Sequence, residues 1–129
     1  MQKVQKTVLV ADADKESRES LARFLSAENL TVYTASIGSE VIQKIQNTRI
    51  KVLIMNVELK GMKAYEIIPI VKKIDPELRI IVTSSDNSLD LARKIRAEGI
   101  FFYALKPLDL EEIKLAVYDA LKNSQKKEG

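Results

Sequence analysis

The stretch "VLIMNVELKGM", residues 52–62, decides the fold. It begins as an apolar, β-branched run of strand length and continues into a polar segment. Such a run is typical of a strand that is buried on both faces and followed by a loop. In open parallel sheets the ligand site lies beyond the carboxyl ends of the strands, and here Asn56 stands at that point. We therefore ask whether Asn56 is an ordinary polar residue or the amide replacement of a reactive carboxylate.

Strand-sized runs of this kind recur along the chain. They are "TVLVA" 7–11, "TVYTA" 31–35, "KVLIM" 51–55, "RIIVT" 79–83 and "IFFYA" 100–104. Between and after them, apolar residues at helical spacing predict helices over 15–28 and 38–48, around Ile67–Ile74 and Leu91–Ile95, and from Asp109 onward. Short strands that alternate with helices predict an α/β domain whose parallel sheet is covered on both faces.

Three features mark where the later helices begin, bend or end. Gly99 is placed to close the fourth helix at its C′ position, and Asp109 with Glu112 forms a capping-box-like start for the fifth. Pro69 lies within the apolar pattern of the third helix and has no N–H to donate. The third helix is therefore expected either to begin near residue 66 or to kink at the proline.

The composition narrows the classes of function. The chain has 129 residues, which predicts one domain, and its 46% apolar and 30% charged residues are typical of a globular protein. No apolar run is long enough to span a membrane and the N-terminus is unlike a secretory signal, so we expect a cytoplasmic protein. The lack of Cys excludes disulfides and thiolate metal sites, and the lack of His excludes imidazole catalysis and imidazole ligands.

The charge distribution gives little support to nucleic-acid binding. The net charge is +3, but Lys and Arg are scattered among Asp and Glu. The one concentrated basic spot is "KNSQKKEG", residues 122–129, which we interpret as a solvated helix end in preference to a nucleic-acid contact. We place the domain at residues 1–123 and a hydrophilic tail at 124–129.

Polar side chains follow four of the five predicted strands. Asp12-Ala13-Asp14 follows the first, Asn56 the third, Thr83-Ser84-Ser85 the fourth and Lys106-Pro107 the fifth. In a parallel sheet these strand ends meet at one edge, so an acid, an amide, a hydroxyl and an ammonium are expected to converge there. The second strand offers nothing comparable, as expected of an edge strand.

Motifs over essentially the whole chain resemble those of the receiver domain of two-component response regulators. They are "VLVADAD" at 8–14, "VLIMNVELKGM" at 52–62, "IIVTSSD" at 80–86 and "GIFFYALKPLD" at 99–109. The last is the most specific, with a Lys-Pro pair after the fifth strand and Tyr103 three residues before the lysine. The resemblance implies a flavodoxin-like (βα)5 three-layer sandwich, a five-stranded parallel sheet in the order 2-1-3-4-5, and a cis Lys106–Pro107 bond.

The resemblance also implies roles for the residues at the strand ends. The family has a phosphoacceptor Asp after the third strand, an acidic pair that holds Mg²⁺ after the first, and a Thr or Ser that senses the phosphoryl group after the fourth. Lys106 matches the lysine that contacts the phosphoryl group, Tyr103 the aromatic switch, and Asp12 the first acid. Ser84, 22 residues before Lys106, matches the hydroxyl switch better than Thr83.

Two positions depart from the family pattern in ways that affect the chemistry. The second acid is replaced by Ala13, and the phosphoacceptor position, 28 residues before Ser84, is Asn56. Lys60 also stands in the loop where proline is common. Aspartyl phosphorylation needs a carboxylate oxygen to attack phosphorus, and the delocalised amide of Asn56 cannot form the acyl phosphate.

The same departures remove most of the ligands for Mg²⁺. Ala13 has no side-chain oxygen, Asn56 has only a neutral carbonyl, and Asp12 is expected to pair with Lys106. Asp14 has no ligand role in the family pattern. We therefore expect no cofactor, with Mg²⁺ binding lost or weak and Asp12 as a weak candidate ligand.

The leading hypothesis is a pseudo-receiver, a degenerate member of the family that acts through protein contacts and is not an enzyme. Such a module would serve a two-component phosphorelay by binding a protein partner without being phosphorylated. We place the contact surface on residues 88–122 (the 88–122 face), centred on Tyr103. Dimerisation through this face is an expectation from the resemblance alone.

Two rival hypotheses stay open. In the first, the chain is a phosphorylatable receiver, either because Asn56 is an engineered replacement of Asp or because Asp12 or Asp14 is a substitute acceptor. Ala13 favours natural divergence over engineering. In the second, Lys106 and backbone N–H groups bind a small anion or nucleotide, although neither G-x-G-x-x-G nor a Walker A motif occurs.

Overall fold

The centre of the molecule is a parallel sheet. The computed structural model of the chain describes residues 6–128, with side chains as far as Lys122. The strands of the sheet are β1 (Thr7–Ala11), β2 (Thr31–Ala35), β3 (Val52–Asn56), β6 (Arg79–Ser84) and β7 (Phe102–Leu105). They lie in the order β2-β1-β3-β6-β7, and every neighbouring pair is parallel. The predicted order 2-1-3-4-5 is confirmed, since β6 and β7 are the fourth and fifth strands of this sheet.

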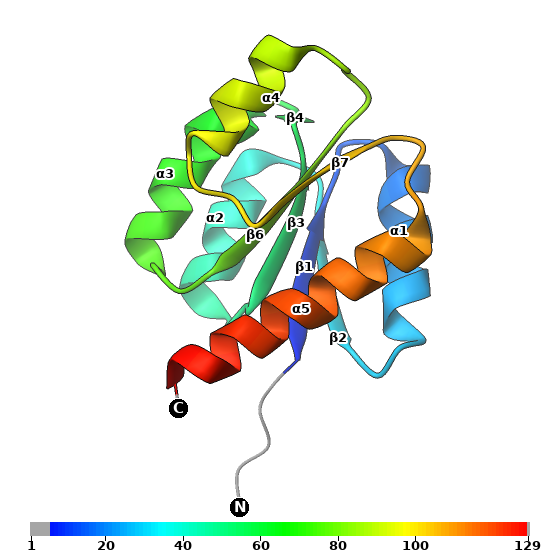
Figure 1. Ribbon diagram of the computed structural model, residues 1–129, viewed down its shortest axis with the longest axis vertical. Coiled ribbons are helices and arrows are strands. Elements are labelled where there is room, and N and C mark those ends of the chain that lie inside the picture. Colours follow the sequence, from blue (N-terminus) through cyan, green and yellow to red (C-terminus); the bar gives the residue numbers. More distant parts are fainter. Residues whose placement is uncertain (1–5, 129) are drawn as a thin grey trace, which may run out of the picture.

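Helices cover both faces of the sheet (Figure 1). They are α1 (Lys15–Ser26), α2 (Gly38–Asn47), α3 (Ala64–Ile74), α4 (Leu89–Arg96) and α5 (Leu110–Glu128). α1 and α5 pack on one face, whereas α2, α3 and α4 pack on the other. This is the three-layer sandwich that the sequence predicted. Over residues 6–128, none of the helices has the length and apolar character needed to cross a membrane.

Alternation along the strands divides the hydrophobic core into two layers. Leu53 and Ile80 point toward α2, α3 and α4, whereas Ile54 and Ile81 point toward α1 and α5. All four side chains are at most 1% exposed. Because successive side chains of a strand point to opposite faces, the same rule decides the side on which each polar residue at a strand end will lie.

The loop after β3 contains a hairpin that the sequence did not predict. β4 (Glu58–Leu59) pairs antiparallel with β5 (Met62–Lys63), and the turn between them has Gly61 at φ +87°. Lys60 forms a further bridge to Ile37, just before α2. A Cβ atom on Gly38 would lie 2.7 Å from the sulfur of Met62, so any other residue would require the Met62 side chain to shift. The hairpin therefore rests against the start of α2.

The start of α3 and the end of α4 can be compared with the positions that the sequence predicted for them. α3 begins at Ala64 rather than near residue 66, and Pro69 lies within it. The backbone N–H just before α3 donates to the Glu66 carboxylate (2.9 Å), so this cap begins the helix upstream of the proline. α4 is capped at Ala97, and Gly99 has φ +80° at the end of the turn that follows.

The last helix continues past the domain boundary predicted at residue 123. Asp109 accepts hydrogen bonds from the N–H groups of Glu111 and Glu112, as expected of the residue that caps α5. The backbone of residues 124–128 extends the same helix. Gly129, the last residue of the predicted tail, lies outside the described residues.

Candidate functional site

Four polar side chains from different strands meet at the carboxyl edge of the sheet. Asp12 directly follows β1, Asn56 ends β3, Thr83 lies near the end of β6, and Lys106 directly follows β7. Each has the same orientation as the core residue two positions earlier, and those core residues all belong to the layer under α1 and α5. The sequence predicted this convergence, with Ser84 in the place that Thr83 takes.

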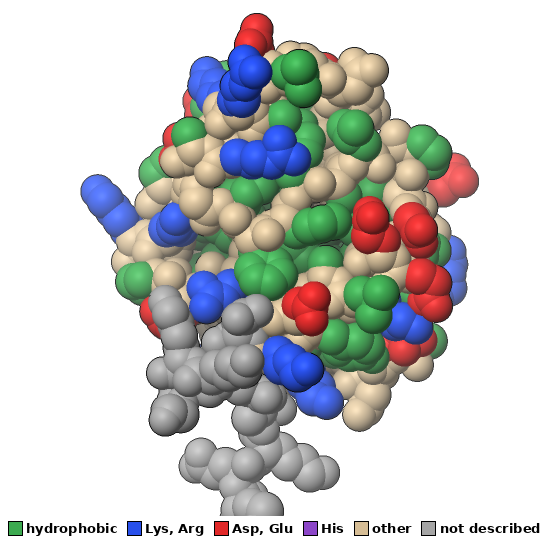
Figure 2. Space-filling view, viewed as in Figure 1, with side chains coloured by type: hydrophobic (Ala, Val, Ile, Leu, Met, Phe, Trp, Pro, Cys, Tyr) green, Lys and Arg blue, Asp and Glu red, His purple; other side chains and the backbone are tan. Residues whose placement is uncertain are grey.

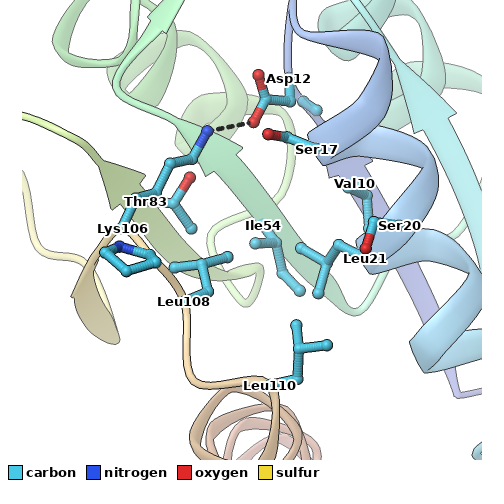
Figure 3. A pocket seen from close by; sticks show the side chains of 12 residues that line it. Val10, Asp12, Ser17, Ser20, Leu21, Ile54, Thr83, Lys106, Leu108 and Leu110 are labelled. Carbon is cyan, nitrogen blue, oxygen red and sulfur yellow. Dashed lines mark hydrogen bonds and ion pairs between the residues drawn. The ribbon is translucent and has the colours of Figure 1, made fainter.

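Asp12 and Lys106 form an ion pair at this edge (Figure 3). Lys106 Nζ lies 2.8 Å from Asp12 Oδ2, and the exposed fractions of the two side chains are 22% and 9%. Asp12 Oδ1 accepts a hydrogen bond from the Asp14 N–H (2.9 Å), and Arg18 donates to the Asp12 carbonyl (2.8 Å). Both carboxylate oxygens of Asp12 are therefore engaged by groups of the protein itself.

The Asn56 side chain has a hydrogen-bond partner for each of its polar atoms. Its nitrogen donates to the Glu58 carbonyl oxygen (3.1 Å), and its oxygen accepts from the Thr83 hydroxyl (3.2 Å). A carboxylate in the same place would set an anionic oxygen against the Glu58 carbonyl oxygen, and a proton or a cation would have to separate the two. The amide removes this conflict because its NH₂ group donates where a carboxylate can only accept.

Ser84, which its spacing matches to the hydroxyl switch, has the opposite orientation to Asn56. Its hydroxyl accepts from the Asp86 N–H (2.9 Å) and donates to the Asp86 carbonyl (3.2 Å), and the residue is fully buried. The β3–β6 register pairs Asn56 with Thr83, so alternation turns the next residue away. The spacing to Lys106 carries no information on this orientation, whereas the alternation of the strand does, and the switch role of Ser84 stays a prediction.

Tyr103 also packs in the layer of α2, α3 and α4, away from the ion pair. Its ring centroid lies 5.2 Å from the guanidinium carbon of Arg96. Its hydroxyl is buried and has no hydrogen-bond partner among the described residues. Beyond Tyr103, the Lys106–Pro107 peptide bond is cis, as the resemblance implied.

Asp14, the other acid near this edge, is the N-cap of α1. Its Oδ2 accepts a hydrogen bond from the Ser17 N–H (2.8 Å). The pKa of the Asp14 carboxyl is held below its usual value of 3.8, chiefly by this bond and by a second one from the Ser17 side chain. The nearby charges of Lys106 and Arg18 lower it further. The carboxylate is thus engaged in capping a helix.

The donor set at this edge does not fit the Mg²⁺ that the resemblance implies. Mg²⁺ is usually held by carboxylates together with water and phosphate oxygens. Among the residues that the structure describes, no three acidic side chains are gathered into a metal site. Ala13 offers no side-chain oxygen, the NH₂ group of Asn56 occupies the nearest carbonyl, and Asp12 is paired with Lys106. These side chains support no metal-dependent step.

A cavity of about 280 Å³ lies beside the ion pair (Figure 3). The polar side chains that line it include Asp12, Ser17, Thr83 and Lys106. The apolar side chains that line it include Leu21, Ile54, Leu108 and Leu110. The apolar residues come from α1, β3, α5 and the segment before α5. No motif predicted this cavity, because its walls are distant in the sequence and spacing carries no signal for them.

The topology and the strand-end residues define an α/β domain of the receiver class. A family model described as the response regulator receiver domain matches residues 8–118. The chain belongs to the response regulator receiver domain family. It is therefore a receiver domain of two-component signalling, and the family that its motifs resemble is confirmed.

Named relatives support the same assignment. The DNA-binding transcriptional regulator NtrC of Azospirillum brasilense is 35% identical over 118 residues, which cover 92% of this chain and 24% of that protein. The chain thus spans about a quarter of the length of the curated relatives that it matches.

Solved structures show the same fold. A CheY-like receiver domain protein from Methanospirillum hungatei JF-1 has a TM-score of 0.91 at 22% identity, covering 96% of this chain and 99% of that one. The beryllofluoride-activated NtrC4 receiver domain dimer has a TM-score of 0.88 at 26% identity, covering 93% and 99%.

Proposed function

We propose that this receiver is a pseudo-receiver, a signalling module of a two-component phosphorelay that acts through protein contacts and accepts no phosphoryl group. The observation that carries the proposal is the Asn56 amide, whose two polar atoms are bonded to Thr83 and Glu58. An amide so placed is an integral part of the local hydrogen bonding rather than a reactive group. We expect the module to act in the cytoplasm, as its composition predicts.

The chemistry of phosphoryl transfer supports this proposal. A carboxylate oxygen must attack phosphorus and form a mixed anhydride, and the delocalised amide of Asn56 carries no full negative charge to do so. Transfer also depends on cations that neutralise the phosphoryl oxygens. Lys106 already pairs with Asp12, and Ala13 supplies no metal ligand. Two separate losses at one edge therefore favour the same conclusion.

The 88–122 face is the surface that we propose for the protein partner. Leu89 and Leu105 are 70% and 49% exposed, and they border a groove of about 350 Å³ that also includes Arg96 and Tyr103. Figure 2 shows hydrophobic side chains between α4 and α5, with basic side chains over α4 and acidic ones over the start of α5. Exposed apolar side chains around a hollow are typical of a contact surface.

The charges on the two rims of this face suit a second copy of the chain. Arg93 and Arg96 lie on α4, whereas Glu111 and Glu112 lie in the first turn of α5. A two-fold axis would set the basic rim of one copy against the acidic rim of the other. The solved NtrC4 receiver is a dimer, and a homodimer is accordingly the first partner to test here.

Acetyl phosphate tests the phosphoryl half of the proposal. We expect incubation with acetyl phosphate and Mg²⁺ to leave the intact mass of the chain unchanged, because neither Asn56 nor its neighbours offer a free carboxylate with a metal. A phosphorylatable receiver treated in parallel shows that the reagent is active. A stoichiometric adduct that hydroxylamine removes would contradict the proposal, and peptide mapping to Asp12 or Asp14 would favour the substitute-acceptor rival.

Sedimentation analysis tests the contact half of the proposal. We expect concentration-dependent dimerisation of the wild-type chain and its loss in Leu105→Glu, which places a charge beside the groove. Ile74→Glu is the matched control, because Ile74 is also an exposed apolar residue (37%) but lies on α3. Equal dimerisation of wild type and Leu105→Glu would show that this face is not the dimer interface, and a wild-type chain that stays monomeric would remove the homodimer. Equal loss in the control would show that the effect is not specific to this face.

A further inference from the structure

The cavity beside the ion pair has features that the proposed function does not use. Its walls are the start of α1, the ends of β1, β3 and β6, and the segment from Lys106 to Leu110. Its lining includes Ser20, an exposed residue of α1. With a volume of about 280 Å³ it lies near the lower end of the range of small-molecule sites, which begins at about 300 Å³.

The charged and the apolar residues lie at different ends of the cavity, and Ser20 lies beside Leu21 at the apolar end (Figure 3). Figure 3 shows Asp12, Lys106 and Thr83 grouped at one end. The other end is lined by the apolar side chains of Leu21, Ile54, Leu108 and Leu110. Ile54 is 1% exposed and Leu21 5%, so the apolar end reaches into the hydrophobic core. A molecule with one polar end and an apolar body would satisfy both parts at once.

The charges at the polar end select the kind of polar group. Asp12 and Lys106 already neutralise each other at 2.8 Å. A bound carboxylate would approach the Asp12 carboxylate, and a bound ammonium would approach the Lys106 ammonium. A neutral carbonyl can instead accept from a further N–H of Lys106, which has three donors. The single hydroxyl proton of Thr83 is already donated to Asn56. The Ser17 hydroxyl is bonded to Asp14, so Lys106 is the donor left for a ligand. The site therefore favours an uncharged acceptor.

We propose that this cavity binds a small uncharged amphipathic molecule, with a carbonyl acceptor toward Lys106 and an apolar body against Leu21, Ile54 and Leu108. The proposal does not depend on dimerisation, but it rests on the part of the proposed function in which Asp12 and Lys106 pair with each other and hold no phosphoryl group. A molecule bound there contacts the ends of β1, β3 and β6 and the segment after β7, so it gives this receiver a second way to sense its surroundings.

A matched series of eight-carbon probes tests the proposal. Octanamide, octanoate and octylammonium share an apolar chain and differ in the charge of the head group. In ¹H–¹⁵N spectra of the full chain, we expect octanamide to cause saturable shifts in the amides of α1, Lys106 and Leu108–Leu110. Octanoate and octylammonium should bind about tenfold more weakly, because each places a charge beside a like charge.

Two tryptophan variants on α1 locate the site. Ser20→Trp places a large side chain in the lining of the cavity and should weaken octanamide binding at least about tenfold. Glu19→Trp adds the same side chain at the neighbouring exposed position, which does not line the cavity, and should bind as the wild type does. Should Ser20→Trp not fold, Leu108→Ala removes part of the apolar wall and should weaken binding about fivefold.

Three outcomes would overturn the proposal. The first is the absence of saturable shifts with octanamide at its solubility limit. The second is equal binding by wild type and by Ser20→Trp, or by Leu108→Ala where that variant replaces it. The third is a set of shifts centred on Leu89 and Leu105, which would show that the probe binds the groove of the 88–122 face instead. Equal binding of all three probes would refute the selection for an uncharged head group.

Discussion

The carboxyl edge of the sheet and the 88–122 face differ in how their exposed groups are satisfied. At the edge, the polar atoms of Asp12 and Asn56 are all bonded to groups of the chain. On the face, Leu89 and Leu105 remain exposed around a groove, and the Tyr103 hydroxyl is buried without a partner among the described residues. The two regions therefore differ in what they leave available: the polar atoms of Asp12 and Asn56 at the edge already have partners, whereas the face keeps exposed apolar side chains.

Restoring two carboxylates should produce the largest change at the edge. In Ala13→Asp/Asn56→Asp, three acids would face Lys106, so we expect Mg²⁺ to bind and acetyl phosphate to phosphorylate residue 56. Without Mg²⁺ the double variant should unfold at a lower temperature than the wild type, because the acids repel one another. With free Mg²⁺ at about 100 times its Kd, the free energy of unfolding should rise by about 2.7 kcal/mol. Thermal unfolding with and without Mg²⁺ measures both effects.

Each single variant provides a control for this restoration. Asn56→Asp alone lacks the ligand at position 13, and Ala13→Asp alone lacks the acceptor, so neither should reach the phosphorylation of the pair. If the double variant neither binds Mg²⁺ nor gains phosphoryl mass, the edge differs from that of a reactive receiver by more than two side chains. The contrast between edge and face would then need another explanation.

Removing the ion pair at the edge should have the next largest effect, which is a fall in the free energy of unfolding. Lys106→Met leaves the Asp12 carboxylate, 9% exposed, without its charged partner, and should lower the free energy of unfolding by about 2 kcal/mol. Lys114→Met is the matched control, because Lys114 is equally exposed at 22% but pairs with a Glu111 side chain that is 67% exposed. Urea unfolding should show a much smaller change for the control. Equal losses would show that the Asp12–Lys106 pair is no stronger than a surface pair.

Thr83 and Ser84 provide a smaller and more local test of the edge. Thr83→Val keeps the shape but removes the donor to Asn56, so the free energy of unfolding should fall by about 1 kcal/mol and the Asn56 NH₂ resonances should shift. Ser84→Ala removes the bonds to Asp86 and should leave those resonances in place. The opposite result would support Ser84 in the switch role that its spacing to Lys106 predicts.

The fold could be predicted from the sequence because the strands are short apolar, β-branched runs, and β1, β3 and β6 are buried along almost their whole length. β1 and β2 match their predicted runs residue for residue, and β3 is displaced by one residue from 51–55. Continuous apolar runs of this length identify such strands without help from tertiary contacts. The β4–β5 hairpin was missed because strands of two residues have no period to detect. Pro69 misled the start of α3, since the Glu66 cap stabilises the turn before it.

The site was predictable in its residues but not in its contacts. Asp12, Asn56 and Lys106 could be placed together because strand order alone brings them to one edge. The choice between Thr83 and Ser84 required the register of β3 against β6, which the spacing to Lys106 does not contain. The cavity and the groove could not be predicted, because their walls come from elements that meet only after folding.

The smallest expected effect is a change in the pKa of Asp14. A lowered pKa distinguishes a carboxylate that caps a helix from one that is free to accept a phosphoryl group. In the unfolded chain the carboxyl returns to its usual pKa, so its contribution to stability is present above about pH 4 and is lost as pH falls through the lower folded value. Ser17→Ala keeps the backbone donor but removes the side-chain bond, and should move the pKa of Asp14 part of the way back toward 3.8. Carboxyl ¹³C titration measures this change, with Glu40 as the internal control because Ser36, not Ser17, lowers its pKa. An Asp14 pKa at or above 3.8 in the wild type would mean that the carboxylate is not held as a cap, and would reopen its candidacy as a substitute acceptor.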